Sequence, residues 1–123
     1  KEYLDMIQER YGIQVQCRIE EEASALKLDD DIEINVFRMI QEAANNSAKH
    51  AQASLISVNI ARKEGLEISI ADDGIGMKEH GVENDHKFGL SILQERAQIV
   101  GADLKFRSGQ SGTEIIIVLP LAQ

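Results

Sequence analysis

Residues 66–76 read Leu-Glu-Ile-Ser-Ile-Ala-Asp-Asp-Gly-Ile-Gly. Apolar residues alternate here with polar or small ones, which is the period of a strand that buries one face. In this phase Asp72 points inward with the apolar residues, whereas Asp73 faces solvent. A buried carboxylate is costly without a donor, so Asp72 needs either a backbone amide that it caps or the amino group of a ligand. The stretch therefore predicts a half-buried strand that ends beside a candidate binding site.

The residues after Asp72 favour the close approach of a ligand. Gly74 and Gly76 flank Ile75, and glycines let the backbone turn sharply and let a flat ligand come near. Thr113 begins another predicted strand with its side chain on the inward face, where it could add a hydroxyl to the same pocket. A structural turn and an ordinary strand start explain the same residues, so both interpretations stay open here.

The segments around this stretch predict a sheet of about five strands and about three helices. Strands are expected over 13–19, 56–60, 66–72, 104–106 and 113–119, with turns at 63–65 and 108–112. Helices are expected over 2–11, 29–51 and 89–100, and loops over 20–29 and 74–88. Because no strand–helix–strand unit repeats, we predict an α+β fold, a two-layer sandwich whose helices cover one face of a mixed, mostly antiparallel sheet.

Composition narrows the class of function. The 123 residues fit one domain, 1–123. The 13 Lys and Arg against 21 Asp and Glu give a net charge of −8, which argues against a domain that binds nucleic acid or anionic membranes. Cys17 is the single cysteine, so no internal disulfide can form and a reducing compartment is the simpler expectation. No apolar run approaches the roughly 20 residues of a membrane span.

A second candidate site is a polar stripe on the predicted 29–51 helix. Glu42, Asn46 and Lys49 are spaced at i, i+4 and i+7 along the edge of its apolar face, and His50 lies between the stripe and that face. Oxygen ligands suit Mg²⁺ and lysine suits phosphate, so the stripe can hold a metal ion and a phosphate chain. A solvated face in which Glu42 and Lys49 relieve each other is the plainer alternative.

The predicted loop 74–88 leads into Gly89 and Leu90 at the start of the last helix. Free amides at a helix N-terminus form an anion site, so a triphosphate tail could sit there under a closing lid that carries Lys87. His80 and His86 are better explained as solvated loop residues than as metal ligands, because no cysteine or glutamate spacing supports a zinc site.

These segments together resemble a known family. In chain order they are Gln-Glu-Ala-Ala-Asn-Asn-Ser-Ala-Lys-His-Ala at 41–51, Asp-Asp-Gly-Ile-Gly-Met at 72–77, Phe-Gly-Leu at 88–90 with Glu-Arg-Ala at 95–97, and Gly-Thr at 112–113. This order resembles the catalytic ATP-binding domain of bacterial two-component sensor histidine kinases, in the branch of the nitrate and degradative-enzyme sensors. The wider superfamily includes DNA gyrase, the ninety-kilodalton heat-shock chaperone and the mismatch-repair ATPase, and it implies the Bergerat ATP-binding fold.

The resemblance implies a role for each matching position. It assigns Mg²⁺ to Asn46 with Glu42 beside the metal and the γ-phosphate, and these two are the expected catalytic residues. It assigns phosphate contact to Lys49, the adenine side to His50 and the adenine amino group to Asp72. The remaining expected nucleotide contacts are Gly74, Ile75 and Gly76 in the first glycine box, Gly89 and Leu90 in the second, and Thr113 near adenine. Lys87 stands where relatives usually have a glycine, which puts the lid conformation in doubt and could add a charge near the phosphates.

The resemblance also implies partners that lie outside this chain. The γ-phosphoryl of ATP would pass to a histidine on an upstream dimerisation domain, and from there indirectly to a response regulator. None of the three histidines suits the acceptor role, because His50 lies in the ATP stripe and the other two lie in the lid. The expected setting is a cytoplasmic domain of a longer homodimeric protein, and membrane anchoring of that protein stays open. The alternatives are an anti-sigma serine kinase of the same superfamily and a degenerate nucleotide-binding docking module.

Overall fold

The structure is a computed structural model that describes residues 2–24, 29–50, 54–63, 65–74, 83–109 and 112–120. Five strands and four helices follow one another along these ranges. In chain order they are α1 (Glu2–Tyr11), β1 (Gln14–Ile19), α2 (Glu21–Ser24), α3 (Asp30–His50), β2 (Leu55–Arg62), β3 (Leu66–Asp72), α4 (Glu83–Val100), β4 (Asp103–Gly109) and β5 (Gly112–Leu119). No helix in the described ranges is long and apolar enough to cross a membrane.

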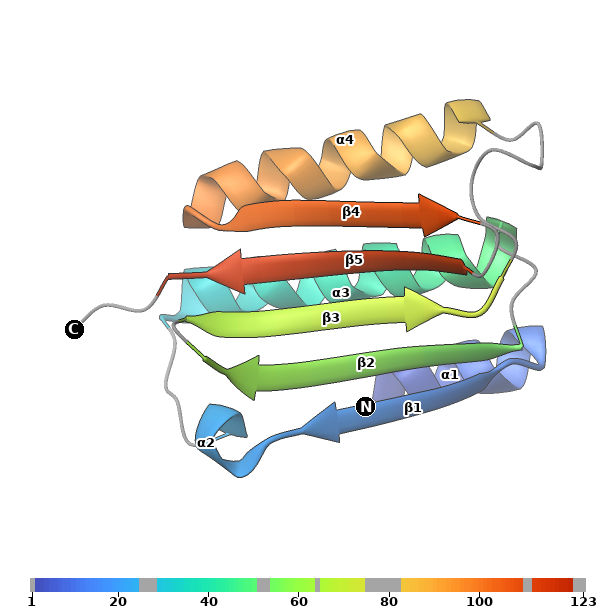
Figure 1. The fold of residues 1–123 in the computed structure, drawn as a ribbon, viewed down its shortest axis with the longest axis horizontal. Helices are drawn as coiled ribbons and strands as arrows, with labels where there is room; N and C mark the ends of the chain where they lie inside the picture. The colour runs from blue at the N-terminus through green and yellow to red at the C-terminus, as the bar shows by residue number, and fades with distance from the viewer. Residues whose placement is uncertain are drawn as a thin grey trace.

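The strands form one mixed sheet in the order β1-β2-β3-β5-β4 (Figure 1). Among the five described strands, only β1 and β2 pair in parallel, and the crossover between them contains α2 and α3. The other three pairings are antiparallel, and the β2–β3 hairpin closes with the Lys63 amide donating to the Gly65 carbonyl at 2.8 Å. The predicted mixed sheet and the predicted hairpin are therefore confirmed, and β3 lies at the centre of the sheet.

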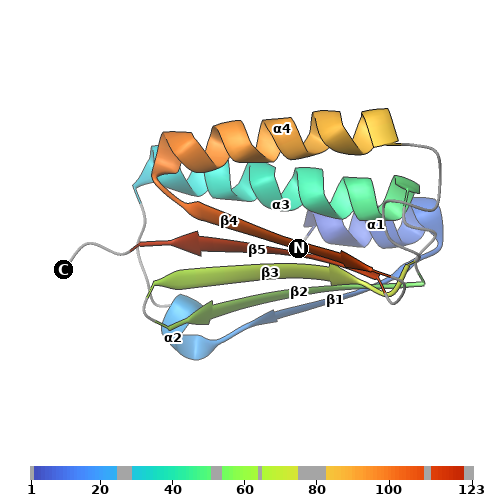
Figure 2. The ribbon, with the colours of Figure 1, turned by 45° about the horizontal axis from the view of Figure 1, so that its top comes forward.

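The three longer helices, α1, α3 and α4, lie on one face of the sheet, as Figure 2 shows. The hydrophobic core fills the space between these helices and the inward side chains of the strands. Its most deeply buried large side chains are Ile7, Met39, Ile56, Ile68, Ile70, Leu93 and Ile117. The opposite face of the sheet carries no long helix among the described residues, so the expected two-layer sandwich is confirmed.

Helix α3 begins and packs as its sequence predicts. Acidic residues in its first turn, Asp30, Asp31 and Glu33, favour the N-terminus through the helix dipole. Further along, Val36, Met39 and Ala43 recur at helical spacing and are buried against the sheet. This packing fixes which edge of α3 faces the end of β3.

Two segments differ from the sequence-based expectation. Residues 21–24 form the short helix α2 within the range expected to be a loop, because two acidic residues favour its first turn and Ala23 is buried against the core. Helix α4 begins at Glu83 rather than at Gly89. Residues 83–88 contain no proline or glycine and carry Glu83 and Asp85 in the first turn, so they extend the helix toward its N-terminus. The end of α4 at Gly101 is as expected, with φ of 70°.

Candidate functional site

Asp72 is the buried carboxylate at the inward end of β3. Its side chain is 9% exposed, and it shares the buried phase of the strand with Leu66, Ile68 and Ile70. Asp73, the next residue, is exposed. The alternation in the sequence therefore assigns both aspartates to the correct faces.

Among the described residues, three donors converge on the Asp72 carboxylate. The Gly74 amide donates to Oδ1 at 2.9 Å, and the Thr113 amide donates to the same atom at 3.3 Å. The Ser47 hydroxyl, which comes from α3, donates to Oδ2 at 2.8 Å. A carboxylate offers about four acceptor positions, so within the described residues these bonds leave one position, on Oδ2, for a further donor. The structural cap is therefore present, and it leaves the carboxylate one acceptor with which to bind a ligand.

The start of β5 lies unusually close to the end of β3. Gly112 has a φ of 132°, and a Cβ atom placed on it would overlap the carbonyl oxygen of Asp72. Glycine is therefore required there, because it alone adopts this backbone conformation without strain and leaves room for the Asp72 carbonyl. This close approach brings the Thr113 amide to the Asp72 carboxylate, with Thr113 itself half-buried and paired with Asp72 in the strand register.

On the solvent side, the Asp73 side chain joins the end of β3 to the start of β2. Its Oδ1 accepts the amides of Ser54 at 2.8 Å and Leu55 at 3.0 Å, and its Oδ2 accepts the Ser54 hydroxyl at 2.6 Å. These bonds, first of all the one from the Ser54 hydroxyl, lower the pKa of Asp73 from its ordinary value. The sequence indicates the exposure of Asp73 but not this role. The signal available in the sequence is Ser54, a hydroxyl residue two positions before the predicted strand 56–60 and directly before the observed β2.

The polar stripe of α3 is present in part. Glu42 and Asn46 are half-buried, one helical turn apart, and Asn46 directly precedes the Ser47 that binds Asp72. Burial, then the neighbouring Tyr11 and then the Glu42 charge raise the pKa of Tyr3, so the field of Glu42 reaches α1. Lys49 and His50 form the last turn of α3, and their side chains lie outside the part of the chain that the structure describes.

The lid and the second glycine segment need a correction. Ile75 and Gly76 lie outside the described residues, while Lys87, Gly89 and Leu90 belong to α4. Because α4 begins at Glu83, its free amides belong to residues 83–86, and the Gly89 amide lies within the helix. The expectation of an anion site formed by free amides at Gly89 and Leu90 is therefore wrong in this structure.

Two contacts are not predicted by the sequence pattern. The helical period assigns Ser47 only to the apolar face of α3, although it is the side chain that connects this helix to Asp72. Arg96 has no predicted contact, although its Nη1 donates to Asn35 Oδ1 at 3.0 Å and so joins α4 to α3. The signals available in the sequence are the Ser47 hydroxyl on a buried helix face and the Arg96 cation on a half-buried helix face. Both groups require hydrogen-bond partners.

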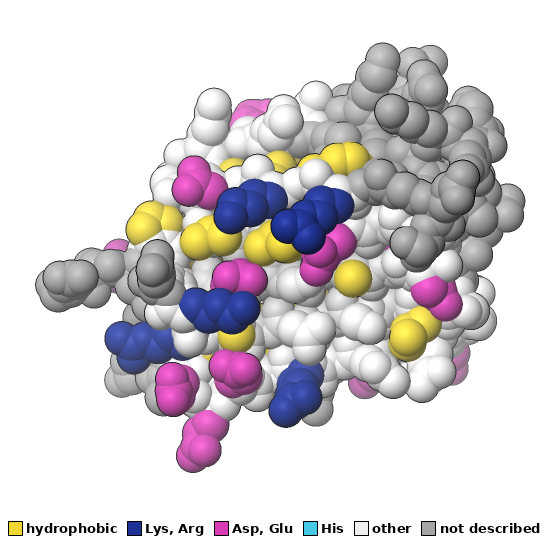
Figure 3. Space-filling view, in the orientation of Figure 1, with side chains coloured by type: hydrophobic (Ala, Val, Ile, Leu, Met, Phe, Trp, Pro, Cys, Tyr) yellow, Lys and Arg dark blue, Asp and Glu magenta, His cyan; other side chains and the backbone are white. Residues whose placement is uncertain are grey.

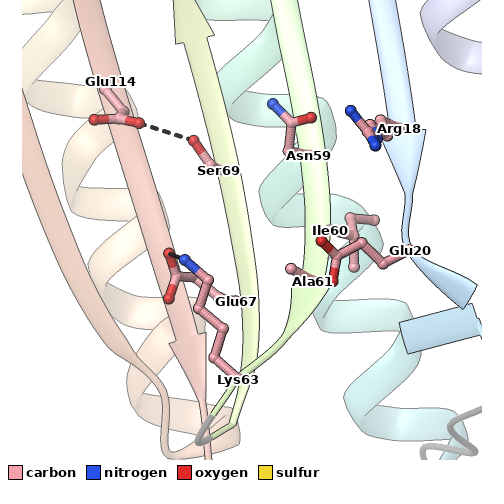
Figure 4. A pocket seen from close by; sticks show the side chains of 9 residues that line it. All are labelled: Arg18, Glu20, Asn59, Ile60, Ala61, Lys63, Glu67, Ser69 and Glu114. Carbon is pink, nitrogen blue, oxygen red and sulfur yellow. Dashed lines mark hydrogen bonds and ion pairs between the residues drawn. The ribbon is translucent and has the colours of Figure 1, made fainter. Parts of the chain in front are cut away.

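The open face of the sheet has a separate hollow of about 390 Å³. Figure 3 shows this face, where cationic, acidic and hydrophobic side chains are mixed. In Figure 4 the side chains that line the hollow project from β1, β2, β3 and β5 and from Glu20 and Lys63, which directly follow β1 and β2. The view includes a Lys63–Glu67 ion pair of 3.6 Å and a hydrogen bond from Ser69 to Glu114. Glu67 and Ser69 have the opposite phase to Asp72 on β3. The hollow is thus distinct from the Asp72 cluster, and its lining contains no sequence-predicted site residue from the described ranges.

Comparison with known proteins places the chain in a family. Residues 31–123 match the family described as histidine kinase-, DNA gyrase B- and HSP90-like ATPase. An uncharacterized sensor-like histidine kinase of Chloroflexus aurantiacus is 33% identical over 98% of this chain and 21% of that protein. The nitrate/nitrite sensor protein NarX of Escherichia coli is 31% identical over 68% of this chain and 14% of its own length. The chain thus spans a small part of these relatives.

Solved structures agree on the fold. The histidine kinase domain of the Erythrobacter litoralis EL346 blue-light activated histidine kinase superposes with a TM-score of 0.79, at 22% identity, over 96% of this chain and 57% of that one. The Acinetobacter baumannii histidine kinase AdeS gives a TM-score of 0.77 at 10% identity, over 99% of this chain and 61% of that one. The chain therefore belongs to the histidine kinase-, DNA gyrase B- and HSP90-like ATPase family, as an ATP-binding catalytic domain of the sensor histidine kinase type.

Proposed function

We propose that this domain binds Mg-ATP at the inward end of β3 and presents the γ-phosphoryl group for transfer to a histidine in another domain of the full protein. The observation that carries this proposal is the Asp72 carboxylate. It is buried, three donors from the described part of the chain fix its orientation, and their bonds leave one acceptor position. A fixed buried acceptor of this kind suits the amino group of an adenine base, which is a donor.

The phosphate end of the nucleotide would lie along α3. Asn46 and Glu42 offer an amide oxygen and a carboxylate one turn apart, and both are half-buried. Mg²⁺ in nucleotide sites takes one or two protein ligands and completes its shell with phosphate oxygens and water, so these two residues fit its needs. When bound, the metal neutralises phosphate charge. Asn46 and Glu42 would hold it, and Lys49 in the last turn of the same helix would add a positive charge.

The chain's contribution to transfer is positioning and charge neutralisation. Phosphoryl transfer needs a nucleotide held in line with the acceptor and little covalent chemistry from the protein. The acceptor is proposed to be a histidine on a dimerisation domain upstream, which would in turn supply a response regulator in two-component signalling. An acidic residue beside that histidine would act as the base, so Glu42 is proposed to serve the metal and the γ-phosphate instead.

Isothermal titration of the 123-residue chain with ATP, with and without Mg²⁺, tests the binding. We expect saturable binding that Mg²⁺ strengthens and that Asn46→Asp and Asp72→Asn weaken. Unchanged affinity in both variants would contradict the proposed site. Incubation with radiolabelled ATP tests whether the acceptor histidine lies outside this chain. We expect no label on this chain alone and label on a partner fragment that carries the dimerisation domain.

A further inference from the structure

Ser47 is a polar residue in an otherwise apolar part of the interface between α3 and the sheet. It is 6% exposed, and Ala43 and Ala44 beside it are fully buried. A serine inside a helix often returns its proton to a carbonyl of its own helix. Here the proton goes across to Asp72 Oδ2, 25 residues away in sequence, at 2.8 Å. The hydroxyl therefore acts on the site rather than on its own helix.

The hydrogen bonds at this pair fix which chemical groups it can still bind. Asp72 Oδ1 has accepted the Gly74 and Thr113 amides, and Oδ2 has accepted the Ser47 proton. A serine hydroxyl has one proton, so with that proton committed the Ser47 oxygen can only accept. With these bonds of the described residues in place, each position that the Ser47–Asp72 pair can still offer to a ligand is an acceptor.

We infer that Ser47 is a specificity-determining residue, because its committed proton leaves the Ser47–Asp72 pair with no donor for a ligand and so disfavours nucleotides that have a carbonyl where adenine has its amino group. This inference rests on the proposed function. A 6-oxopurine would place an oxygen against Oδ2 and the Ser47 oxygen with no proton between them. Buried polar groups left unpaired in this way weaken binding strongly.

The role of Ser47 can be separated from that of Asp72 by removing the hydroxyl alone. In Ser47→Ala the space left by the hydroxyl borders the Asp72 carboxylate and can admit a water molecule. Water has two protons, so it can donate one to Asp72 Oδ2 and the other to a ligand carbonyl. The serine cannot do this, because its single proton is already used. Loss of the hydroxyl therefore relaxes the exclusion of a carbonyl while Asp72 remains.

The test is the ratio of dissociation constants for Mg-ITP and Mg-ATP, measured by titration calorimetry on the 123-residue chain. Wild type is expected to prefer ATP by about 100-fold, and Ser47→Ala to lower this ratio by about tenfold. Ser69→Ala is the matched control, because Ser69 also donates its proton to a carboxylate, that of Glu114, but on the opposite face of the sheet. Its ratio should equal that of wild type.

Each outcome of the titration supports or overturns the inference. If Ser47→Ala weakens ATP and ITP by the same factor, the serine only supports the fold, and the inference is overturned. Should the alanine variant unfold, Ser47→Thr is measured in its place, because threonine retains the hydroxyl. This variant must keep the wild-type ratio of the ITP and ATP dissociation constants. If it still binds ATP but no longer prefers ATP over ITP, the inference is overturned. Absence of ATP binding in folded wild-type chain overturns the proposed function itself, and the inference with it.

Discussion

Gly112 and Asp72 are in contact through their backbones, with the α-carbon of Gly112 facing the Asp72 carbonyl so closely that no side chain fits between them. The contact joins the first residue of β5 to the last residue of β3. It also sets the next residue pair, in which the Thr113 amide donates to Asp72 Oδ1. The backbone of β5 therefore helps to orient the Asp72 carboxylate.

Replacement of Gly112 by alanine should damage both stability and the site. The φ of 132° is strained for any residue with a side chain, and the new methyl group would push β5 away from the Asp72 carbonyl. We expect a loss of about 3 kcal/mol in the free energy of unfolding, measured in urea, together with weaker ATP binding by calorimetry.

Gly101→Ala is the control for Gly112→Ala. Gly101 also has a positive φ, 70°, but a methyl group there meets no atom within 4 Å. Only backbone strain is added, so a loss of about 1 kcal/mol with unchanged ATP affinity is expected. Equal effects of the two substitutions on ATP affinity would show that the contact with Asp72 has no part in the site.

Asp72→Asn should reverse the preference of the pocket rather than only weaken it. The amides of Gly74 and Thr113 need an acceptor, so the asparagine oxygen should take the Oδ1 position and its NH₂ group the Oδ2 position. That group then donates to Ser47 and directs its other proton into the pocket. ATP affinity should fall about 10- to 100-fold, while the preference for ATP over ITP disappears or inverts.

Calorimetric titration of the Asp72→Asn variant with Mg-ATP and Mg-ITP checks this expectation. Asp73→Asn is the control, because Asp73 is exposed and has the opposite phase to Asp72. A variant at position 72 that keeps the wild-type ratio of the two affinities would refute the orientation derived for the asparagine amide.

The strand geometry of the site can be predicted well from the sequence, because a period of two leaves few choices. Once Leu66, Ile68 and Ile70 are placed inward, Asp72 has to follow and Asp73 has to face out. Thr113 reaches its position by the same reasoning on β5. Local alternation alone is therefore enough to predict one wall of the candidate site.

The helices are harder to predict, for two physical reasons. The period of α3 indicates which residues face the sheet, but not how far the helix slides along it, and this displacement decides that Ser47 meets Asp72. At α4, residues 74–88 show neither the strand nor the helix period, so the sequence predicts a loop that ends at Gly89, yet an isolated glycine inside a helix lowers its stability by only about 1 kcal/mol. The residues of its first turns outweigh that loss.

The exposed Asp73 should make stability depend on pH in the acidic range. Hydrogen bonds from Ser54 and Leu55 favour its charged form, so the folded-state pKa of Asp73 lies below the ordinary value of 3.8. Between those two values the unfolded chain binds more protons than the folded one. The stabilisation is therefore fully present above the ordinary value and is lost as the pH falls through the folded-state value.

Urea unfolding of wild type and Asp73→Asn, compared from pH 7 down to about 3, measures this effect. The wild type should be the more stable protein at pH 7, by a small margin because the group is exposed to solvent screening. The margin should shrink as the pH falls below about 4, since protonated aspartic acid and asparagine then resemble each other. A margin that stays constant with pH would contradict the lowered pKa of Asp73.

The hydrogen bond from Arg96 to Asn35 should contribute to the docking of α4 on α3. Arg96 is half-buried and its bond to Asn35 Oδ1 is 3.0 Å long, while Asn35 also donates to the Asp31 carbonyl in its own helix. Arg96→Ala is expected to lower the free energy of unfolding by about 1–2 kcal/mol. A double-mutant cycle with Asn35→Ala isolates the pair, and its coupling should be about 1 kcal/mol.

This hydrogen bond should stabilise the fold without acting on the pocket. The ITP-to-ATP ratio should stay at the wild-type value in Arg96→Ala and Asn35→Ala, because neither side chain is bonded to the Ser47–Asp72 pair. A coupling near zero in the double-mutant cycle would mean that packing of Leu93 and Ala97, rather than this hydrogen bond, holds α4 in place, since both of those side chains are buried in the core.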